Sequence, residues 1–159
     1  MACAAGPFVV RPLRRVARMR NKFPAPRLVK IGSVGGENAI PAEMTSVLLV
    51  EDELLVRELA SEDLGEIGFE VTAASDGDEA LGYLREGRHF DLLFTDIRMP
   101  GATDGWLLAQ EARKLLPGIR VIYATGLGEA ADGLCEGERY VRKPYTLDDL
   151  RDALTELGF

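Results

Sequence analysis

The carboxylate of Asp96 is the first candidate for chemistry in this sequence. It closes the apolar segment 92–95 and is followed by Met99, Pro100 and Gly101. Proline lacks the N–H group that a sheet ladder requires, so a strand is expected to stop there. Ligands bind at the carboxyl ends of the strands in an open α/β sheet. Asp96 is therefore a candidate site residue, and an aspartate that only caps a turn is the alternative.

Polar side chains also follow three other apolar segments, at Glu51-Asp52, at Thr125 and at Lys143. If the segments are parallel strands, these ends lie on the same edge as Asp96. Carboxylates that crowd together raise one another's pKa values, and a hard divalent cation such as Mg²⁺ relieves that repulsion. This pattern predicts a magnesium site at the edge of the sheet.

The remaining two residues favour phosphoryl chemistry. An ammonium group such as that of Lys143 pairs with a phosphoryl oxygen, and the Thr125 hydroxyl can donate to another. A carboxylate between them, Asp96, can then act as a nucleophile toward phosphorus.

Hydrophobic periodicity predicts the elements that position these residues. Strands are expected at 46–50, 69–73, 92–96, 120–125 and 140–142, with helices over 54–67, 75–84, 106–116 and 147–157 and a weak, glycine-interrupted one in 126–137. Strands that alternate with helices indicate a parallel sheet covered on both faces, with right-handed crossovers. The helix over 75–84 is expected to bury Ala80, Leu81 and Leu84, and Thr146 should cap the last helix.

Charge separates residues 1–43 from the rest of the chain. They hold 8 basic and 2 acidic residues, whereas residues 44–159 hold 11 and 24, so the formal charges are +6 and −13. The first segment is interpreted as a disordered basic extension, as an organellar transit peptide, or as sequence ahead of a natural start at Met44, and we favour the last. A chain that begins at Met44 is expected to fold.

Composition excludes several classes of protein. The acidic charge of 44–159 argues against nucleic-acid binding by the folded domain, and no apolar run reaches the roughly 20 residues of a membrane span. The cysteines, Cys3 and Cys135, lack metal-ligand spacing, so both are expected to be free thiols in a reducing compartment. Trp106 is expected to be a packing residue.

At the candidate site residues the sequence resembles the receiver domain of two-component response regulators. The resemblance covers about 45–159 and rests on four pieces in this order: Val47-Leu48-Leu49-Val50-Glu51-Asp52, Thr95-Asp96-Ile97-Arg98-Met99-Pro100, Ala124-Thr125, and Tyr140-Val141-Arg142-Lys143-Pro144. It implies a flavodoxin-like, doubly wound five-stranded parallel sheet in the order 2-1-3-4-5, with helices on both faces.

The resemblance also implies a role for each site residue. Asp96 would accept a phosphoryl group from a histidine kinase or a histidine phosphotransfer protein. Asp52 and Asp96 would bind Mg²⁺ (or Mn²⁺) directly, Glu51 largely through water, and Arg98 through its backbone carbonyl.

Three further assignments come from the same resemblance. Thr125 and Lys143 would hold the phosphoryl oxygens, and Tyr140 would be the aromatic residue that turns inward when the switch operates. The Lys143–Pro144 peptide would be cis, a form that X–Pro bonds tolerate.

The sequence departs from the family pattern in the loop 101–105, which is one residue longer than the usual loop, and in the stretch from Thr125 to Tyr140, which is shorter than usual. These features resemble a subset of stand-alone receivers with an Ala-Thr-Gly signature and a short, mobile fourth helix. The chain is therefore expected to be a cytoplasmic, single-domain response regulator, a phosphoacceptor rather than an enzyme, with a separate downstream protein as its output.

Three alternatives remain open at this point. Gly126, Gly128 and Ala131 match a dinucleotide-binding pattern, but Gly133 interrupts the helix that such a site needs. A Mg²⁺-dependent phosphatase with an aspartyl nucleophile would need a second aspartate where Arg98 stands. A receiver-like interaction module without phosphorylation would not need the full set of site residues.

Overall fold

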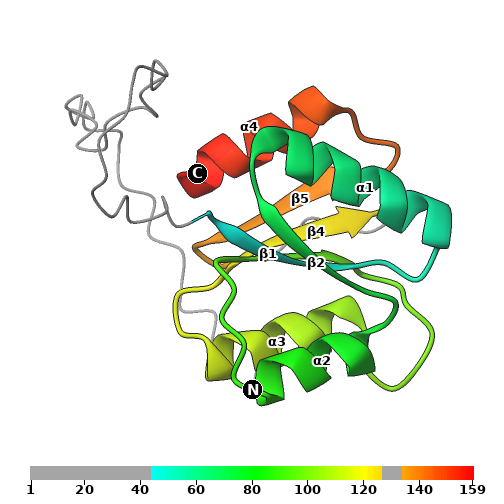
Figure 1. Cartoon of the computed structure of the whole chain (residues 1–159), viewed down its shortest axis with the longest axis vertical. Helices are drawn as coiled ribbons and strands as arrows, with labels where there is room; N and C mark the ends of the chain where they lie inside the picture. Colours follow the sequence, from blue (N-terminus) through cyan, green and yellow to red (C-terminus); the bar gives the residue numbers. More distant parts are fainter. Residues whose placement is uncertain (1–43, 127–133) are drawn as a thin grey trace, which may run out of the picture. The chain divides into compact units, whose positions relative to one another are not determined.

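The computed structural model describes residues 44–126 and 134–159, and all of its elements lie in these two ranges (Figure 1). In chain order they are β1 (Ser46–Val50), α1 (Leu54–Ile67), β2 (Glu70–Ala74), α2 (Gly77–Arg85), β3 (Leu92–Asp96), α3 (Gly105–Leu115), β4 (Arg120–Thr125), β5 (Glu138–Arg142) and α4 (Leu147–Leu157).

The five strands form one parallel sheet in the order β2-β1-β3-β4-β5, as the sequence predicted. The chain moves outward from β1 to β2 and then crosses back to β3. The carboxyl ends of β1, β3 and β4 meet at one edge, because their registers pair Val50 with Thr95 and Asp96 with Ala124. That edge is where the site residues follow their strands.

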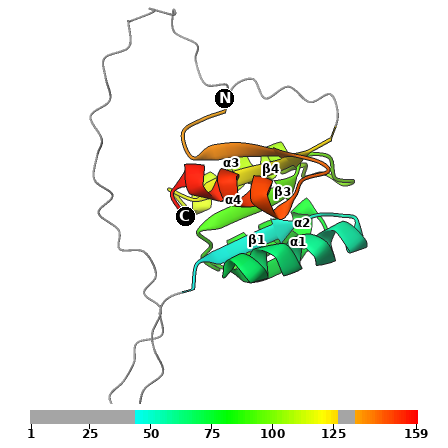
Figure 2. The ribbon, with the colours of Figure 1, turned by 90° about the horizontal axis from the view of Figure 1, so that it is seen from above.

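Helices cover both faces of the sheet. Figures 1 and 2 show α1 and α4 on one face and α2 and α3 on the other. Alternate residues of β1 supply the two cores: Val47 and Leu49 pack with α1 and α4, and Leu48 and Val50 pack with α2 and α3. All four are fully buried, which explains why this strand reads as a continuous apolar run.

Polar side chains begin three of the helices, and the predicted cap at Thr146 is confirmed. Asp76 accepts from the Glu79 N–H at 2.8 Å, and Asp104 accepts from the Leu107 N–H at 2.8 Å. Thr146 and Asp149 form a capping box at the start of α4. Such caps satisfy N–H groups that the first helical turn leaves without partners.

The first helix differs from its sequence pattern. Leu54, Leu55 and Leu59 recur at helical spacing, yet their exposed fractions are 56%, 67% and 63%. Ala60 and Leu64 are the buried residues of α1. A small residue at the centre of the contact lets the helix approach the sheet, and the leucines lie outside that contact.

Two strand boundaries also differ. β2 begins and ends one residue later than expected, and β5 begins at Glu138 because that residue pairs with Val121 of β4. The buried face predicted for α2, with Ala80, Leu81 and Leu84, is confirmed.

Some expectations lie outside the described residues. These are the disorder of 1–43, the thiol of Cys3 and the helical content of 127–133. Within the described part, 134–137 form a turn that leads into β5, and Cys135 is not in a disulfide. No helix of the described ranges is long and apolar enough to cross a membrane.

Candidate functional site

Three carboxylates meet where β1 and β3 end. Glu51 and Asp52 directly follow β1, and Asp96 is the last residue of β3. One oxygen of each lies within 4.8 Å of the others. Glu51 is buried, Asp96 is partly buried and Asp52 is exposed, so the cluster opens to solvent on the Asp52 side.

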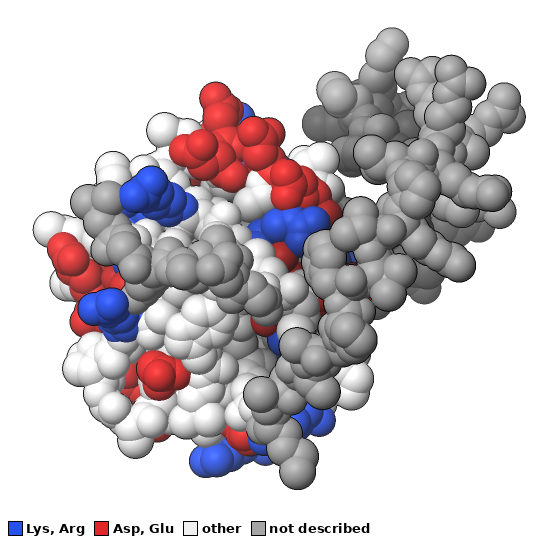
Figure 3. Space-filling view, turned by 180° about the vertical axis from the view of Figure 1, so that it is seen from behind, with Lys and Arg blue, Asp and Glu red and all other residues white. Residues whose placement is uncertain are grey.

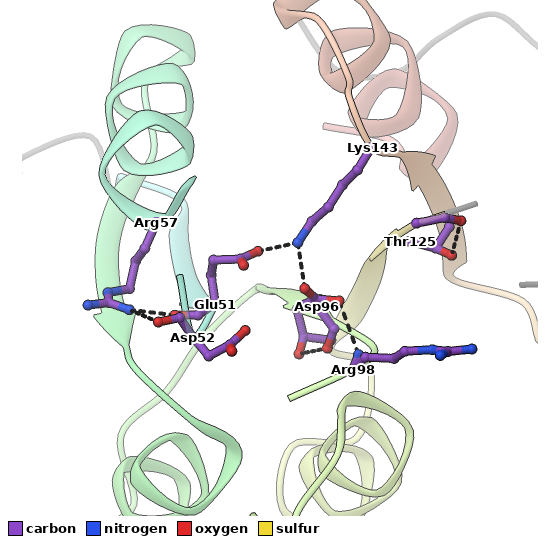
Figure 4. A network of polar contacts seen from close by, with 9 residues as sticks. Glu51, Asp52, Arg57, Asp96, Arg98, Thr125 and Lys143 are labelled. Atoms are coloured by element: carbon purple, nitrogen blue, oxygen red, sulfur yellow. Dashed lines mark hydrogen bonds and ion pairs between the residues drawn. The ribbon is translucent and has the colours of Figure 1, made fainter. Parts of the chain in front are cut away.

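Lys143 joins this cluster from the segment after β5. Its Nζ donates to Glu51 Oε2 at 2.6 Å and to Asp96 Oδ2 at 2.5 Å, as Figure 4 shows. The side chains of Lys143, Glu51 and Asp96 are 23%, 3% and 14% exposed. The sequence analysis predicted that these residues meet, and the structure brings them together.

Burial and charge act in opposite directions in this cluster. Burial raises the pKa of the Glu51 carboxyl, although its hydrogen bond and charge interaction with Lys143 act to lower it. For Lys143 burial acts to lower the pKa, but its bonds to Asp96 and Glu51 prevail and the pKa is raised. With Lys143 protonated and all three carboxyl groups ionised, these four residues carry a formal charge of −2.

Arg57 is a residue of this region that the sequence analysis did not single out. Its Nη1 donates to the backbone carbonyl of Glu51 at 2.6 Å and to that of Asp52 at 3.3 Å. Figure 4 shows its side chain running from α1 to these carbonyls, on the far side of the acidic pair from Lys143. Arg57 therefore holds the backbone that presents both carboxylates.

Thr125 ends β4, and Tyr140 lies in the middle of the neighbouring strand β5. Thr125 is 6% exposed, and its backbone carbonyl accepts from the Lys143 N–H at 2.7 Å. Tyr140 is half-buried, and its ring centroid lies 5.5 Å from that of Tyr123 and 5.9 Å from that of Trp106. Trp106 does pack against these rings, and it is 42% exposed.

The segment after Asp96 turns back toward its carboxylate. The Arg98 N–H donates to Asp96 Oδ1 at 3.0 Å, so each oxygen of Asp96 has a donor, Arg98 on one and Lys143 on the other. The Lys143–Pro144 peptide is cis, which confirms that prediction.

This arrangement suits transfer of a group to Asp96. The Asp96 carboxylate is reachable from solvent and an ammonium group touches it. Hard oxygen donors lie around it, as oxygen-binding divalent cations require. Nucleophile, positive charge and candidate metal ligands are thus assembled at one point of the sheet edge.

Comparison with known proteins gives a consistent result. The family model described as the response regulator receiver domain matches residues 47–155. Among curated relatives, the chain is 37% identical over 115 residues to the probable transcriptional regulator ycf27 of Cyanophora paradoxa, covering 70% of this chain and 47% of that protein. It is 33% identical over 141 residues to the sensor histidine kinase RcsC of Escherichia coli, covering 80% of this chain and 14% of the kinase. The chain thus spans less than half of either relative.

Solved structures agree with this assignment. A response regulator receiver protein from Sinorhizobium medicae superimposes with a TM-score of 0.66 at 32% identity, covering 72% of this chain and 94% of that one. The receiver domain of the hybrid histidine kinase CckA gives a TM-score of 0.60 at 34% identity, covering 70% and 97%. With its sheet order, its acidic strand ends and these similarities, the chain belongs to the response regulator receiver domain family.

Proposed function

We propose that the chain is a response regulator receiver that accepts a phosphoryl group on Asp96 from a histidine kinase or a histidine phosphotransfer protein. The observation that carries the proposal is the meeting of Asp96 with Glu51, Asp52 and the Lys143 ammonium group at the end of β3. A carboxylate that served only as a turn cap would not need this surrounding charge.

The proposed step is a direct displacement at phosphorus. A carboxylate oxygen of Asp96 attacks the phosphorus atom, the bond from phosphorus to the donor histidine nitrogen breaks, and an acyl phosphate forms. The electron pair of the broken bond stays on that nitrogen, and a neutral imidazole leaves because the other nitrogen of the ring carries a proton. Lys143, which contacts Asp96 Oδ2 beforehand, is placed to pair with an oxygen of the transferred group.

The donor set fits a divalent cation, Mg²⁺ or Mn²⁺. Asp52 and Asp96 would bind it through carboxylate oxygens, Arg98 through its backbone carbonyl, and Glu51 largely through water. When bound, the cation offsets the negative charge shared by the carboxylates and the incoming phosphoryl group. Arg57 holds the backbone of Glu51 and Asp52, so it supports these ligands without binding the cation.

Thr125 and Tyr140 are proposed as the switch. The Thr125 hydroxyl would move to a phosphoryl oxygen, and the Tyr140 ring would then turn inward toward the space that Thr125 leaves. Their positions on neighbouring strands support this pairing: Tyr140 is the ladder partner of Tyr123, which lies two residues before Thr125 and so on the same face of the sheet. The effect on 127–133 lies outside the described residues.

The partners are proposed to be proteins rather than nucleic acid. Residues 44–159 carry a formal charge of −13. On the face that Figure 3 draws, basic and acidic side chains of the described residues form separate patches, without a continuous basic surface.

The test is phosphorylation by a small donor. The purified protein in Mg²⁺ and acetyl phosphate should gain one phosphoryl group by intact-mass spectrometry, and hydroxylamine should remove it. Asp96→Asn should abolish the gain, and Asp52→Asn should slow it by removing a cation ligand. Asp152→Asn is the matched control, because it is the same chemical change at an exposed position of α4.

Undiminished labelling of Asp96→Asn would contradict the proposal. So would continuous release of phosphate from small esters, which is the behaviour of a phosphatase. Stoichiometric labelling that stops at one group per chain supports the phosphoacceptor.

A further inference from the structure

The loop 97–104 between β3 and α3, here called the β3–α3 loop, is fixed at both ends to the backbone around Asp96. At its start the Ile97 N–H donates to the Ala124 carbonyl at 3.3 Å. At its end the Gly105 N–H donates back to the Ile97 carbonyl at 3.1 Å, and a Cβ on Gly105 would stand 2.1 Å from the Asp96 carbonyl oxygen. Both ends of the loop therefore lie beside the backbone of Asp96 and Ile97.

The middle of the loop is held from another element, the first turn of α2. Thr103 Oγ1 donates to Asp78 Oδ1 at 2.5 Å across 25 residues of sequence, and Thr103 is only 5% exposed. A Cβ on Gly77 would lie 2.2 Å from the Thr103 carbonyl oxygen, so the two backbones are in direct contact. Only glycine at position 77 permits this approach.

The two halves of the loop are held by different contacts. In the first half the Arg98 N–H donates to the Asp96 carboxylate at 3.0 Å, and Met99 is 8% exposed and packs in the core with residues of α2 and α3. Residues 100–102 are exposed, so burial of apolar surface does not determine their positions. A buried hydroxyl that donates to a carboxylate is a strong and directional restraint, so the bond from Thr103 to α2 restrains this second half.

We propose that Asp78 and Thr103 are positioning residues for the cation site. Their hydrogen bond fixes the β3–α3 loop so that the Arg98 carbonyl stands beside the Asp96 carboxylate before the cation arrives. Groups that orient a metal ligand without touching the metal alter its affinity in this way. The inference rests on the proposed function, since it assumes that a divalent cation binds Asp52, Asp96 and the Arg98 carbonyl.

Isothermal titration of the full chain with Mg²⁺ tests this inference without any phosphorylation. Thr103→Val removes the hydroxyl and nearly keeps the shape, and it should weaken Mg²⁺ binding by about three- to tenfold. Thr103→Ser restores the hydroxyl and should return the affinity to within about twofold of the wild type. Thr155→Val, the same chemical change at an exposed position of α4, is the matched control and should have no effect.

A double-mutant cycle distinguishes this bond from general damage to the fold. Asp78→Ala should weaken Mg²⁺ binding as Thr103→Val does, and the double variant should be no weaker than either single one, because both remove the same bond. Independent, additive losses would overturn the proposal. It would also be overturned if Thr103→Val lowered the melting temperature but left the Mg²⁺ affinity unchanged, or if Thr103→Ser bound as weakly as Thr103→Val.

Failure of the proposed function looks different. In that case the wild type itself would show no Mg²⁺ binding, or Asp52→Asn would bind as tightly as the wild type, and both proposals would fall together. A wild type that loses binding in Asp52→Asn but keeps it in Thr103→Val would overturn the positioning role alone.

Discussion

Two buried glutamates, Glu51 and Glu138, stand at opposite edges of the same sheet and are held in opposite ways. Glu51 follows the carboxyl end of β1, and Glu138 is the first residue of β5. They are 2% and 4% exposed, so burial alone does not distinguish them. Their hydrogen-bond partners do.

Glu138 has donors on both of its oxygens. Its Oε1 accepts from the Tyr123 hydroxyl at 2.8 Å and pairs with Arg113 Nη2 at 2.5 Å, and its Oε2 accepts from the Cys135 N–H at 2.5 Å. Burial acts to raise the pKa of Glu138, but these three donors prevail and lower it. Burial together with the bond to Glu138 strongly raises the pKa of the Tyr123 hydroxyl.

Among the described residues, Glu51 has a single positively charged partner, the Lys143 ammonium group, and it shares this partner with Asp96. Lys143 also contacts Asp96, Asp52 lies within the same cluster, and the pKa of Glu51 is raised rather than lowered. A buried acid with matched donors stabilises the fold, whereas crowded acids with an insufficient number of cations are costly unless a ligand is bound. The contrast indicates that Glu138 stabilises the fold, whereas Glu51 belongs to the proposed cation site at the carboxyl ends of the strands, here called the binding edge.

The largest expected effect is on stability at Glu138. Glu138→Gln should lower the free energy of unfolding by about 2–3 kcal/mol, because an amide offers one acceptor oxygen where donors approach from both sides. Chemical denaturation monitored by circular dichroism measures it. Glu156→Gln is the control: its side chain is 63% exposed in the pair with Arg139, so the loss should stay below about 1 kcal/mol. Equal losses of unfolding free energy in the two variants would contradict the claim that Glu138 stabilises the fold.

Mg²⁺ should stabilise the fold only through the acidic cluster around Glu51, and not through Glu138. At a concentration a hundredfold above its dissociation constant it should raise the free energy of unfolding by about 2.7 kcal/mol, since it binds only the folded state. Glu138→Gln should gain as much as the wild type, and Asp52→Asn should gain far less. Thermal unfolding with and without Mg²⁺, with EDTA as the baseline, gives both values. A Mg²⁺ effect that persists in Asp52→Asn would place the cation elsewhere.

The lowered pKa of Glu138 should be visible in the pH dependence of the free energy of unfolding. A carboxyl group whose folded pKa is lowered stabilises the fold above its unfolded pKa, and loses this contribution as the pH falls through the folded value. The difference in unfolding free energy between the wild type and Glu138→Gln should therefore be constant from pH 7 to about pH 5 and should shrink below the ordinary glutamate value of 4.5. A difference that grows on acidification would contradict the direction of the pKa shift.

The smallest change in unfolding free energy is expected when the other buried glutamate, Glu51, is replaced by glutamine. Without Mg²⁺, Glu51→Gln should change the free energy of unfolding by less than about 1 kcal/mol, because losing the bond to Lys143 is offset by removing a buried charge from a crowded cluster. The measurement repeats the denaturation series in EDTA. A loss as large as that of Glu138→Gln would show that Glu51 is as well compensated as Glu138, and the comparison would fail.

The sequence predicts the binding edge better than it predicts the Glu138 network. Asp52, Asp96 and Lys143 each follow an apolar segment, and parallel strands necessarily bring such ends together. Their meeting could be predicted because it depends on topology alone. Tyr123 and Glu138 meet through the register of β4 and β5, which no local pattern specifies.

Local sequence patterns did not predict the contacts that depend on tertiary packing. The leucines at 54, 55, 59 and 64 fit a helix, and the helix forms, but of these four only Leu64 is buried against the sheet, together with Ala60. The bond from Thr103 to Asp78 spans 25 residues and follows no recognisable motif. Arg57 was within reach of prediction, because an arginine one turn into the helix after an acidic pair can return to the preceding carbonyls.

The position of Trp106 gives this protein a built-in optical label. It is the chain's single tryptophan, and its ring lies 4.5 Å from Tyr123 and 5.9 Å from Tyr140. It also directly follows Gly105, whose backbone rests against the Asp96 carbonyl. Light absorbed by either tyrosine is within transfer range of one indole that is 42% exposed. Emission from the unmodified protein therefore originates beside both the proposed acceptor aspartate and the proposed switch tyrosine, and its spectrum can be followed in real time without attaching a dye.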